Sequence, residues 1–238
     1  LSHNWRSMGF YNHYVTYSEM LMLVASLIFG LLLAAFGSSA RRRNWNVMML
    51  GTAFVGTCVA LLLTVTRASQ LALMISAFSI ILRGASKKIA IAAVVIAIPV
   101  VVGGLIFLQQ SRQTGFFDSK DESTRYRFVM WNDGGRLLTD SPRNFVFGVG
   151  MDSIQKHWQE WGMYEGGFLP MGHFHSVPVQ IAVERGIPAL LIWLIVLAIL
   201  ARTLWRGISL ARGGDWRSFG ILLGTFSALV GFFVSGFV

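Results

Sequence analysis

The chain has 238 residues, of which 54% are hydrophobic and only 13% are charged. A soluble domain of this length carries about a quarter charged residues, so the composition excludes an ordinary soluble domain. The single cysteine, Cys58, excludes an intramolecular disulfide and a cysteine-based metal cage, and we interpret it as a packing residue.

Apolar stretches follow one another along the chain, most of them long enough to cross a hydrocarbon core of ~30 Å, which takes ~20 residues. They cover residues 14–36, 46–65, 69–83, 89–108, 179–200 and 219–238, and the third is short and polar at its start. The predicted fold class is therefore all-α: a polytopic helical membrane protein with about six transmembrane helices and one long, partly helical loop.

The same stretches predict the organisation of the chain. Residues 1–108 hold transmembrane helices one to four, residues 109–178 form the loop, and residues 179–238 hold helices five and six. The chain starts at Leu1 rather than Met, and its last span ends without a flanking charge. We therefore expect both ends to be cut from a larger membrane protein.

The basic residues behind the net charge of +9 are distributed as the predicted topology requires. Ten basic residues, against Asp215 alone, lie in the connections after spans one, three and five: Arg41, Arg42, Arg43, Arg83, Lys87, Lys88, Arg202, Arg206, Arg212 and Arg217. The loop 109–178 has seven basic and eight acidic residues. The positive-inside rule predicts that the loop is outside, and the charge gives no support to nucleic-acid binding.

Within the loop, "STRYRFVMWNDGGRLL" predicts a helix at about 123–139, and "SPRNFVFGVGM" predicts a turn followed by an extended segment. Gly148 and Gly150 lack the context of a dinucleotide fingerprint, and we expect them to allow a close turn. Asp152 with Gln155 is typical of a capping box. The helix that follows, with an apolar face of Ile154, Trp158 and Trp161, either lies at the membrane interface or caps the bundle.

The stretch "GHFHSVPVQIAVERGIP" leads into span five. Ser176 suits an N-cap and Pro178 the first turn, so His175 is expected at the outer mouth of a helix whose free amides favour anions. That position favours a neutral imidazole, the form that a general base needs. The alternative is a histidine that is hydrogen-bonded at the headgroup boundary.

Arginines are the second polar feature of the predicted outer face. Arg67 lies between two apolar stretches, and either faces an interior partner or reaches the interface from a tight hairpin. Arg125 and Arg127 could equally be solvated loop residues. The outer face lacks a metal-binding cluster, a Ser-His-Asp set and a P-loop, so it suits an anionic, diphosphate leaving group that arginines bind without Mg²⁺.

The loop and span five together resemble the O-antigen ligase and O-antigen polymerase superfamily. Its pattern corresponds here, in order, to Arg127, Trp131, Pro142, Gly148, Gly150, His175, Val179, Gln180, Glu184 and Gly186. "TVTRASQLAL" is similar to the family's Thr-x-Ser-Arg segment, with its arginine at Arg67. This sequence departs at Ser176, where Asn is common, and at Val179, where Leu is usual.

The resemblance implies a metal-independent, inverting glycosyltransferase in the bacterial inner membrane, with its active site on the periplasmic face and no cofactor. Because members of the family have about ten to twelve spans, it also implies that this chain is a C-terminal portion of such a protein. The donor would be a glycan on undecaprenyl diphosphate, and the acceptor a hydroxyl of lipid A-core. His175 would take the acceptor proton, Arg67, Arg127 and Arg125 would bind the diphosphate, and His173, Ser176, Gln180 and Glu184 would have supporting roles.

Two rival functions stay open at this point. An O-antigen polymerase or a protein O-oligosaccharyltransferase would share the chemistry and differ in the acceptor. A transporter or flippase for the same lipid-linked glycan would require charges at mid-membrane depth and repeated pairs of spans, and the sequence shows neither.

Overall fold

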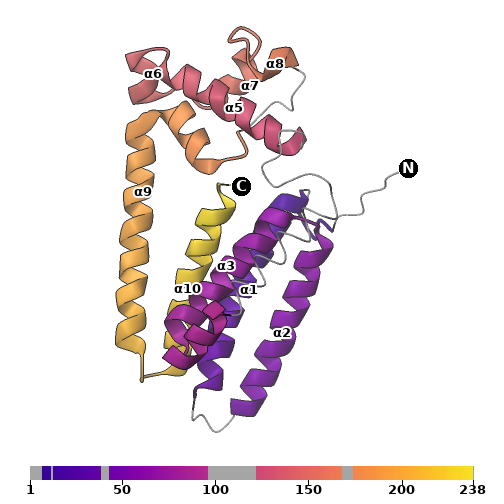
Figure 1. The fold of residues 1–238 in the computed structure, drawn as a ribbon, viewed down its shortest axis with the longest axis vertical. Coiled ribbons are helices and arrows are strands. Elements are labelled where there is room, and N and C mark those ends of the chain that lie inside the picture. The colour runs from indigo at the N-terminus through magenta and orange to yellow at the C-terminus, as the bar shows by residue number, and fades with distance from the viewer. Residues whose placement is uncertain (1–6, 12, 39–42, 96–121, 168–173, 238) are drawn as a thin grey trace, which may run out of the picture. The chain divides into compact units, whose positions relative to one another are not determined.

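A computed structural model describes residues 7–11, 13–38, 43–95, 122–167 and 174–237 (Figure 1). Within these ranges the regular elements are helices, and no strand occurs. The main helices are α1 (Tyr14–Phe36), α2 (Arg43–Leu63), α3 (Arg67–Gly84), α5 (Glu122–Thr139), α6 (Pro142–Phe147), α7 (Ser153–His157), α8 (Tyr164–Gly167), α9 (Val177–Ala211) and α10 (Trp216–Ser235).

Four helices are long and apolar enough to cross a membrane: α1, α2, α9 and α10. They match four of the six predicted spans. The third predicted span forms the 18-residue α3, whose polar first turn keeps its hydropathy lower. The fourth begins as a helix at residues 87–95, and the rest of the predicted span, residues 96–108, lies outside the described residues.

The chain divides into two compact units. Unit 1 comprises Leu1–Ile96 and Ile199–Ser235, and unit 2 comprises Ala97–Ala198 and Gly236–Val238. The helix α9 therefore begins in unit 2 and ends in unit 1.

Unit 1 is a bundle in which α1, α3 and α10 pack through small residues. Ser76 of α3 donates a hydrogen bond to Ser26 of α1 at 2.7 Å, and both are fully buried. A Cβ added to Gly30 of α1 would lie 2.5 Å from the backbone of Gly224 in α10, so these two helices touch backbone to backbone. Small residues and interhelical hydroxyl bonds are the usual means of helix association in lipid, where the hydrophobic effect gives no driving force.

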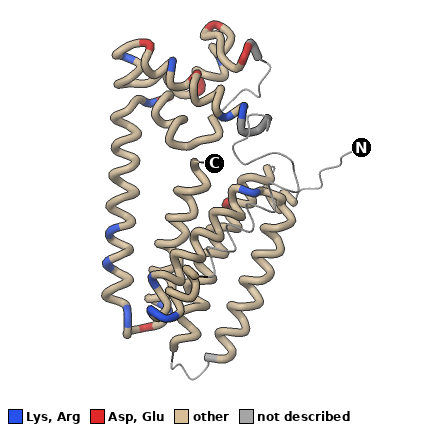
Figure 2. The backbone as a smooth tube through the Cα atoms, in the orientation of Figure 1, with Lys and Arg blue, Asp and Glu red and all other residues tan. Residues whose placement is uncertain are grey.

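The basic connections after α3 and α9 meet at one end of unit 1 (Figure 2). Arg212, at the end of α9, donates to the backbone carbonyl of Arg83 at the end of α3. A Cβ at the adjacent Gly84 would lie 2.8 Å from Leu33, near the end of α1. Arg67 is the first residue of α3, and an 18-residue helix is ~27 Å long. Arg67 therefore lies at the opposite end of unit 1 from these connections, as the predicted topology requires.

Unit 2 is built on α5, which confirms the helix predicted at 123–139 and runs without a break through Gly134 and Gly135. Its apolar face packs in a core cluster with Ile154, Phe174 and Val183, among others. The Asn-Asp-Gly-Gly stretch did not kink it.

Two sequence predictions in unit 2 are wrong. Residues 142–147 form the helix α6 rather than an extended segment, because Ser141 caps it by accepting from the Asn144 amide at 3.1 Å and Pro142 occupies its first turn. Asp152 precedes α7 but makes no side-chain cap hydrogen bond, since its backbone is left-handed at φ 58°. The capping box is absent there.

The helix after Asp152 packs on the core cluster of unit 2, and the two alternatives given for it from the sequence both stay predictions. Ile154 is 1% exposed, and Trp158 and Trp161 are partly buried against the same core cluster. These tryptophans therefore form part of the packing of unit 2.

Candidate functional site

The candidate site is assembled on one face of α5. Arg127, Trp131 and Gly134 recur at intervals of four and three residues, so they share one stripe of the helix. Arg125 is two residues from Arg127, which turns it by about 200° around the helix axis. The two arginines therefore point to different sides, and only Arg127 shares the stripe of Trp131.

Phe174, the residue before His175, is held through both of its backbone groups. The indole Nε1–H of Trp131 donates to the Phe174 carbonyl at 2.9 Å. The Phe174 amide donates to the Gln180 side-chain oxygen at 3.0 Å. Its ring is fully buried, and a Cβ at Gly134 would lie 2.9 Å from that ring. The chain entering α9 is thus attached both to α5 and to the first turns of α9 itself.

His175 follows this attachment point with a left-handed backbone, φ 50°. Positive φ is uncommon outside glycine, although Asn, Asp and His adopt it more often than other residues. Such a conformation persists where the surroundings determine it, and here both sides are anchored, by Phe174 and by the buried Ser176. The imidazole is exposed while its backbone is fixed.

The helix α9 starts at the position that the sequence predicted, but one of its first amides is hydrogen-bonded. The helix begins at Val177, directly after Ser176, and Pro178 lies in its first turn. The Val177 amide, however, donates to the Gly236 carbonyl at 2.8 Å, and proline has no amide. The Val177 amide is therefore bonded rather than free for an anion, and Pro178 supplies none, so this end of α9 offers fewer free amides than the sequence suggested.

Glu184 and the motif glycines form a backbone junction. The amides of Val149 and Gly150 donate to the carbonyls of Val183 and Glu184 at 2.9 and 3.0 Å. A Cβ at Gly148 would overlap the Glu184 backbone. The expected close turn at Gly148 and Gly150 is confirmed, and its role is to bring the segment after α6 against α9.

Gly186 is the matching glycine on α9. Its φ of 83° interrupts the helix, and a Cβ there would overlap the carbonyl of Val146 in α6. The two glycine motifs of the sequence thus meet each other and set the bend between the first turns of α9 and its long apolar part.

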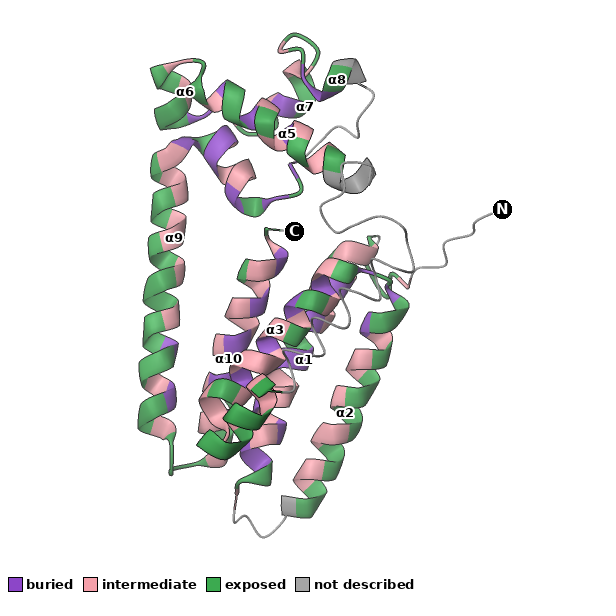
Figure 3. Cartoon of the chain, viewed as in Figure 1, coloured by how far each residue is buried: buried purple, intermediate pink, exposed green. Residues whose placement is uncertain are grey.

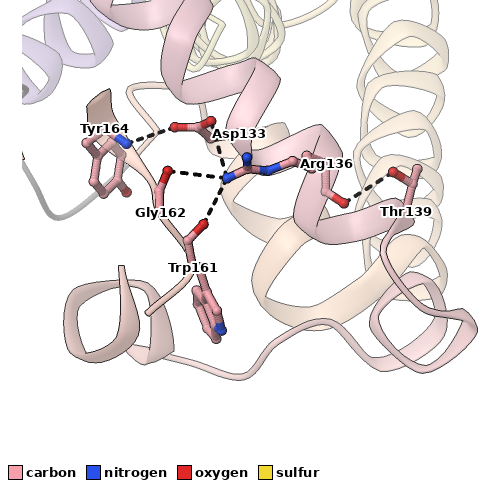
Figure 4. Close-up of polar contacts among 6 residues, drawn as sticks. All are labelled: Asp133, Arg136, Thr139, Trp161, Gly162 and Tyr164. Carbon is pink, nitrogen blue, oxygen red and sulfur yellow. Dashed lines mark hydrogen bonds and ion pairs between the residues drawn. The ribbon is translucent and has the colours of Figure 1, made fainter. Parts of the chain in front are cut away.

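A polar cluster at Asp133 ties α8 to α5 (Figure 4). Asp133 accepts from the Tyr164 amide at 2.8 Å and lies 3.8 Å from Arg136, which donates to the Trp161 carbonyl at 2.8 Å. Tyr164 is fully buried, and its hydroxyl has no hydrogen-bond partner in the described part of the chain. Burial, followed by the charges of Asp133 and Glu184, raises the pKa of Tyr164 to about 12.

The sequence analysis did not single out this cluster. Asp133 and Arg136 are spaced i, i+3 on one helix, a pattern that is usual on any solvated helix, so their sequence spacing did not distinguish them. Tyr164 carried no signal, because its partner Asp133 is 31 residues away.

The other predicted site residues divide between the two units. Arg125 forms an exposed ion pair with Glu165 at 2.7 Å. Arg67 belongs to unit 1, where it is exposed at the start of α3 after a turn in which Val65 has φ 54°. Unit 2 thus contains all the other described site residues: Arg125, Arg127, His175, Ser176, Gln180 and Glu184. His173 lies outside the described residues.

No group of three His, Cys, Asp or Glu side chains in the described ranges could hold a metal ion. A cavity of about 440 Å³ is lined by Gly37, Gly84, Gly213 and Trp216, among others, at the basic end of unit 1. It contains none of the predicted site residues.

In a comparison with known protein families, residues 52–194 match a family described as O-antigen ligase. This range includes every predicted site residue and more than half of the chain. The chain belongs to the O-antigen ligase family. No curated protein matches the chain. The family match confirms the resemblance drawn from the sequence motifs, and it characterises the chain as part of an integral membrane enzyme of the ligase and polymerase type.

Proposed function

We propose that the protein is a glycosyltransferase that moves a glycan from undecaprenyl diphosphate to a hydroxyl of a lipid A-core acceptor at the periplasmic face of the bacterial inner membrane. The observation that carries this proposal is the exposed imidazole of His175 on a backbone fixed from α5 and α9, in a chain of the O-antigen ligase family.

In the proposed reaction, His175 accepts the proton of the acceptor hydroxyl as its oxygen attacks the anomeric carbon. The bond between that carbon and the diphosphate oxygen breaks, and the configuration inverts. A fixed imidazole suits general base catalysis, which contributes ~10²–10⁴-fold to a rate.

Arg127 is the proposed partner of the departing diphosphate. It lies one helical turn before Trp131, the residue that bonds the chain next to His175, so its guanidinium is carried on the same side of α5. A guanidinium can bind two phosphate oxygens at once and stays protonated throughout, which suits a leaving group whose negative charge increases.

Arg67 is proposed as a second diphosphate ligand on the strength of the family motif and of its place at the end of α3 away from the basic connections. Arg125 is a weaker candidate than the sequence suggested, because Glu165 already neutralises it at 2.7 Å.

The test is transfer by the purified intact protein from a lipid-linked glycan donor to one of three acceptors: lipid A-core, a second lipid-linked glycan or a peptide. Product on lipid A-core, unchanged in excess EDTA, supports the proposal. Product only on the second glycan or the peptide would instead identify a polymerase or a protein glycosyltransferase. Movement of intact donor across vesicles without transfer would identify a flippase.

A further inference from the structure

The helix α6 exposes its apolar side chains together with Arg143, and only its polar residue Asn144 faces inward. Phe145, Val146 and Phe147 are 45%, 41% and 72% exposed, and α6 has no buried residue (Figure 3). Asn144 faces the unit, where its side-chain amide donates to the Leu137 carbonyl at 3.0 Å. A surface helix of a water-soluble domain has the opposite arrangement, with its apolar stripe on the core.

Met151 extends this surface beyond the end of α6. It is 62% exposed, and Arg185 of α9 donates to its sulfur at 3.6 Å. We define the α6 face as Phe145, Val146, Phe147 and Met151. The exposed Arg143 and Arg185 lie next to it along the chain or in contact with it.

The depth of this face relative to a membrane follows from the bend in α9. Val146 touches Gly186 backbone to backbone, so α6 lies at the level of the bend. From Ile187 the helix runs without charge to Arg202, and the 20 residues to Arg206 measure ~30 Å, the thickness of a hydrocarbon core. If Arg206 lies at one boundary, Gly186 lies at the other.

We propose that the α6 face inserts into the lipid leaflet next to the outer end of α9, as an interfacial anchor of unit 2. Aromatic side chains are favourable at this depth, and the adjacent arginines would meet anionic headgroups. Lipid is the occupant that explains why the face is apolar, why it lies at the level of Gly186 and why it is flanked by cations.

The anchor has a consequence for the proposed chemistry, which rests on the function proposed above. The backbone bonds from Val149 and Gly150 to Val183 and Glu184 join the end of α6 to the turns of α9 that carry Gln180. Through them, the depth of α6 in the leaflet would fix the height of His175 above the membrane, where the diphosphate of a lipid-linked donor lies.

The test measures depth and needs no substrate. Spin labels are placed on single cysteines at positions 145, 147 and 151 of the intact protein in a Cys58→Ala background, reconstituted into phosphatidylethanolamine–phosphatidylglycerol vesicles. Labels at Asn132 and Gln159, which are exposed on the same unit, serve as controls. The ratio of collision rates with oxygen and with a water-soluble nickel complex reports the depth of each label.

The expected result is a ratio several-fold higher at positions 147 and 151 than at both controls. A ratio at 147 equal to the control ratio would place the face in water and overturn the proposal. Immobilised labels that neither reagent reaches would show that protein covers the face, and would overturn it as well. Phe147→Glu should lower the ratio of the label at 151. Because no transfer is measured, a failed anchor and a failed glycosyltransferase assignment are distinguishable.

Discussion

The indole Nε1–H of Trp131 donates to the backbone carbonyl of Phe174 at 2.9 Å, so a residue of α5 holds the chain one position before His175. The side-chain oxygen of Gln180, which follows His175 in the sequence, accepts a hydrogen bond from the amide of Phe174. Trp131 and Gln180 are therefore positioning residues: each acts on His175 through Phe174 and neither needs to touch a substrate.

Removing either bond should lower kcat more than it changes KM. Trp131→Phe replaces the indole by a smaller phenyl ring without an N–H, and Gln180→Met removes the acceptor. In each variant a buried backbone group of Phe174 loses its partner, at a cost of about 1–3 kcal/mol. Gln180→Glu keeps an acceptor oxygen and should restore most of kcat. Steady-state rates with donor and acceptor varied separately check this, and equal losses in the Met and Glu variants would contradict it.

The neighbouring glycines of α5 should respond in opposite ways to alanine. A Cβ at Gly134 meets Phe174 at 2.9 Å and Val183 at 3.1 Å, whereas a Cβ at Gly135 meets nothing within 4 Å. Gly135→Ala should stabilise unit 2 by roughly 0.5–1 kcal/mol through helix propensity. Gly134→Ala should lower both the melting temperature and the transfer rate. Thermal unfolding in detergent compares the pair, and equal melting temperatures would count against the packing described.

How much the sequence could predict is clear from α5 and α6. The apolar spacing predicted α5 nearly to its ends, because helical periodicity over 18 residues is a strong local signal. The six-residue α6 was predicted as extended, since so short an element has no period and its start depends on the Ser141–Pro142 pair. Asp152 is a residue type that often caps helices, but its left-handed backbone conformation is not that of a cap. Only the fold determines this φ angle.

The candidate site also has features that the sequence predicted and contacts that it did not. Motif order identified Gln180 and Gly186, but not that Gln180 bonds Phe174 or that Gly186 meets Val146. The contact of Gly186 with Val146 joins segments tens of residues apart. The bond between Phe174 and Gln180 spans only six residues, but the left-handed backbone of His175 lies between them, and sequence spacing does not predict it.

The two arginines of α5 should differ in their effect on transfer. Arg127→Ala should lower the rate by about 10²–10³-fold if it stabilises the leaving diphosphate, and Arg127→Lys should restore only part of it, because the fork is lost. Arg125 forms an exposed pair with Glu165, a type of contact worth ~0–1 kcal/mol. Arg125→Ala should therefore cost less than about fivefold. Transfer rates at saturating donor test this difference. A larger loss in Arg125→Ala than in Arg127→Ala would mean that Arg125, not Arg127, binds the diphosphate.

Tyr164→Phe should leave the protein as stable or make it more stable, because the variant removes a buried hydroxyl that has no partner among the described residues. The raised pKa of Tyr164 also makes the stability of the folded protein depend on pH. The phenol is neutral in the folded state, so its contribution is complete below its ordinary pKa of about 10 and is lost as pH rises through about 12.

Ultraviolet titration of tyrosinate should therefore show a component near 12 that Tyr164→Phe removes. Tyr164→Leu is the packing control and should lower the melting temperature, because the ring packs against Trp158 with centroids 6.3 Å apart. A Phe variant as unstable as the Leu variant would mean that the hydroxyl is bonded after all.

The central claim is that His175 is the general base, and its backbone offers a clean set of variants. Asn adopts a left-handed backbone readily, so His175→Asn should fold while losing the base, and His175→Gly should fold and leave room for added imidazole. His157→Asn is the matched control on the same unit, since His157 pairs with the exposed Glu160 at 2.9 Å. His173→Asn is a second control, with a packing role expected.

The most direct measurement is the single-turnover rate of glycan transfer by these variants, each shown to be folded and membrane-inserted. His175→Asn should be slower than the native protein by ~10²–10⁴-fold, whereas His157→Asn should stay near the native rate and His173→Asn should lose far less than His175→Asn. Added imidazole should raise the rate of His175→Gly and not that of His175→Asn. A folded His175→Asn protein that transfers glycan at close to the native rate would contradict the account.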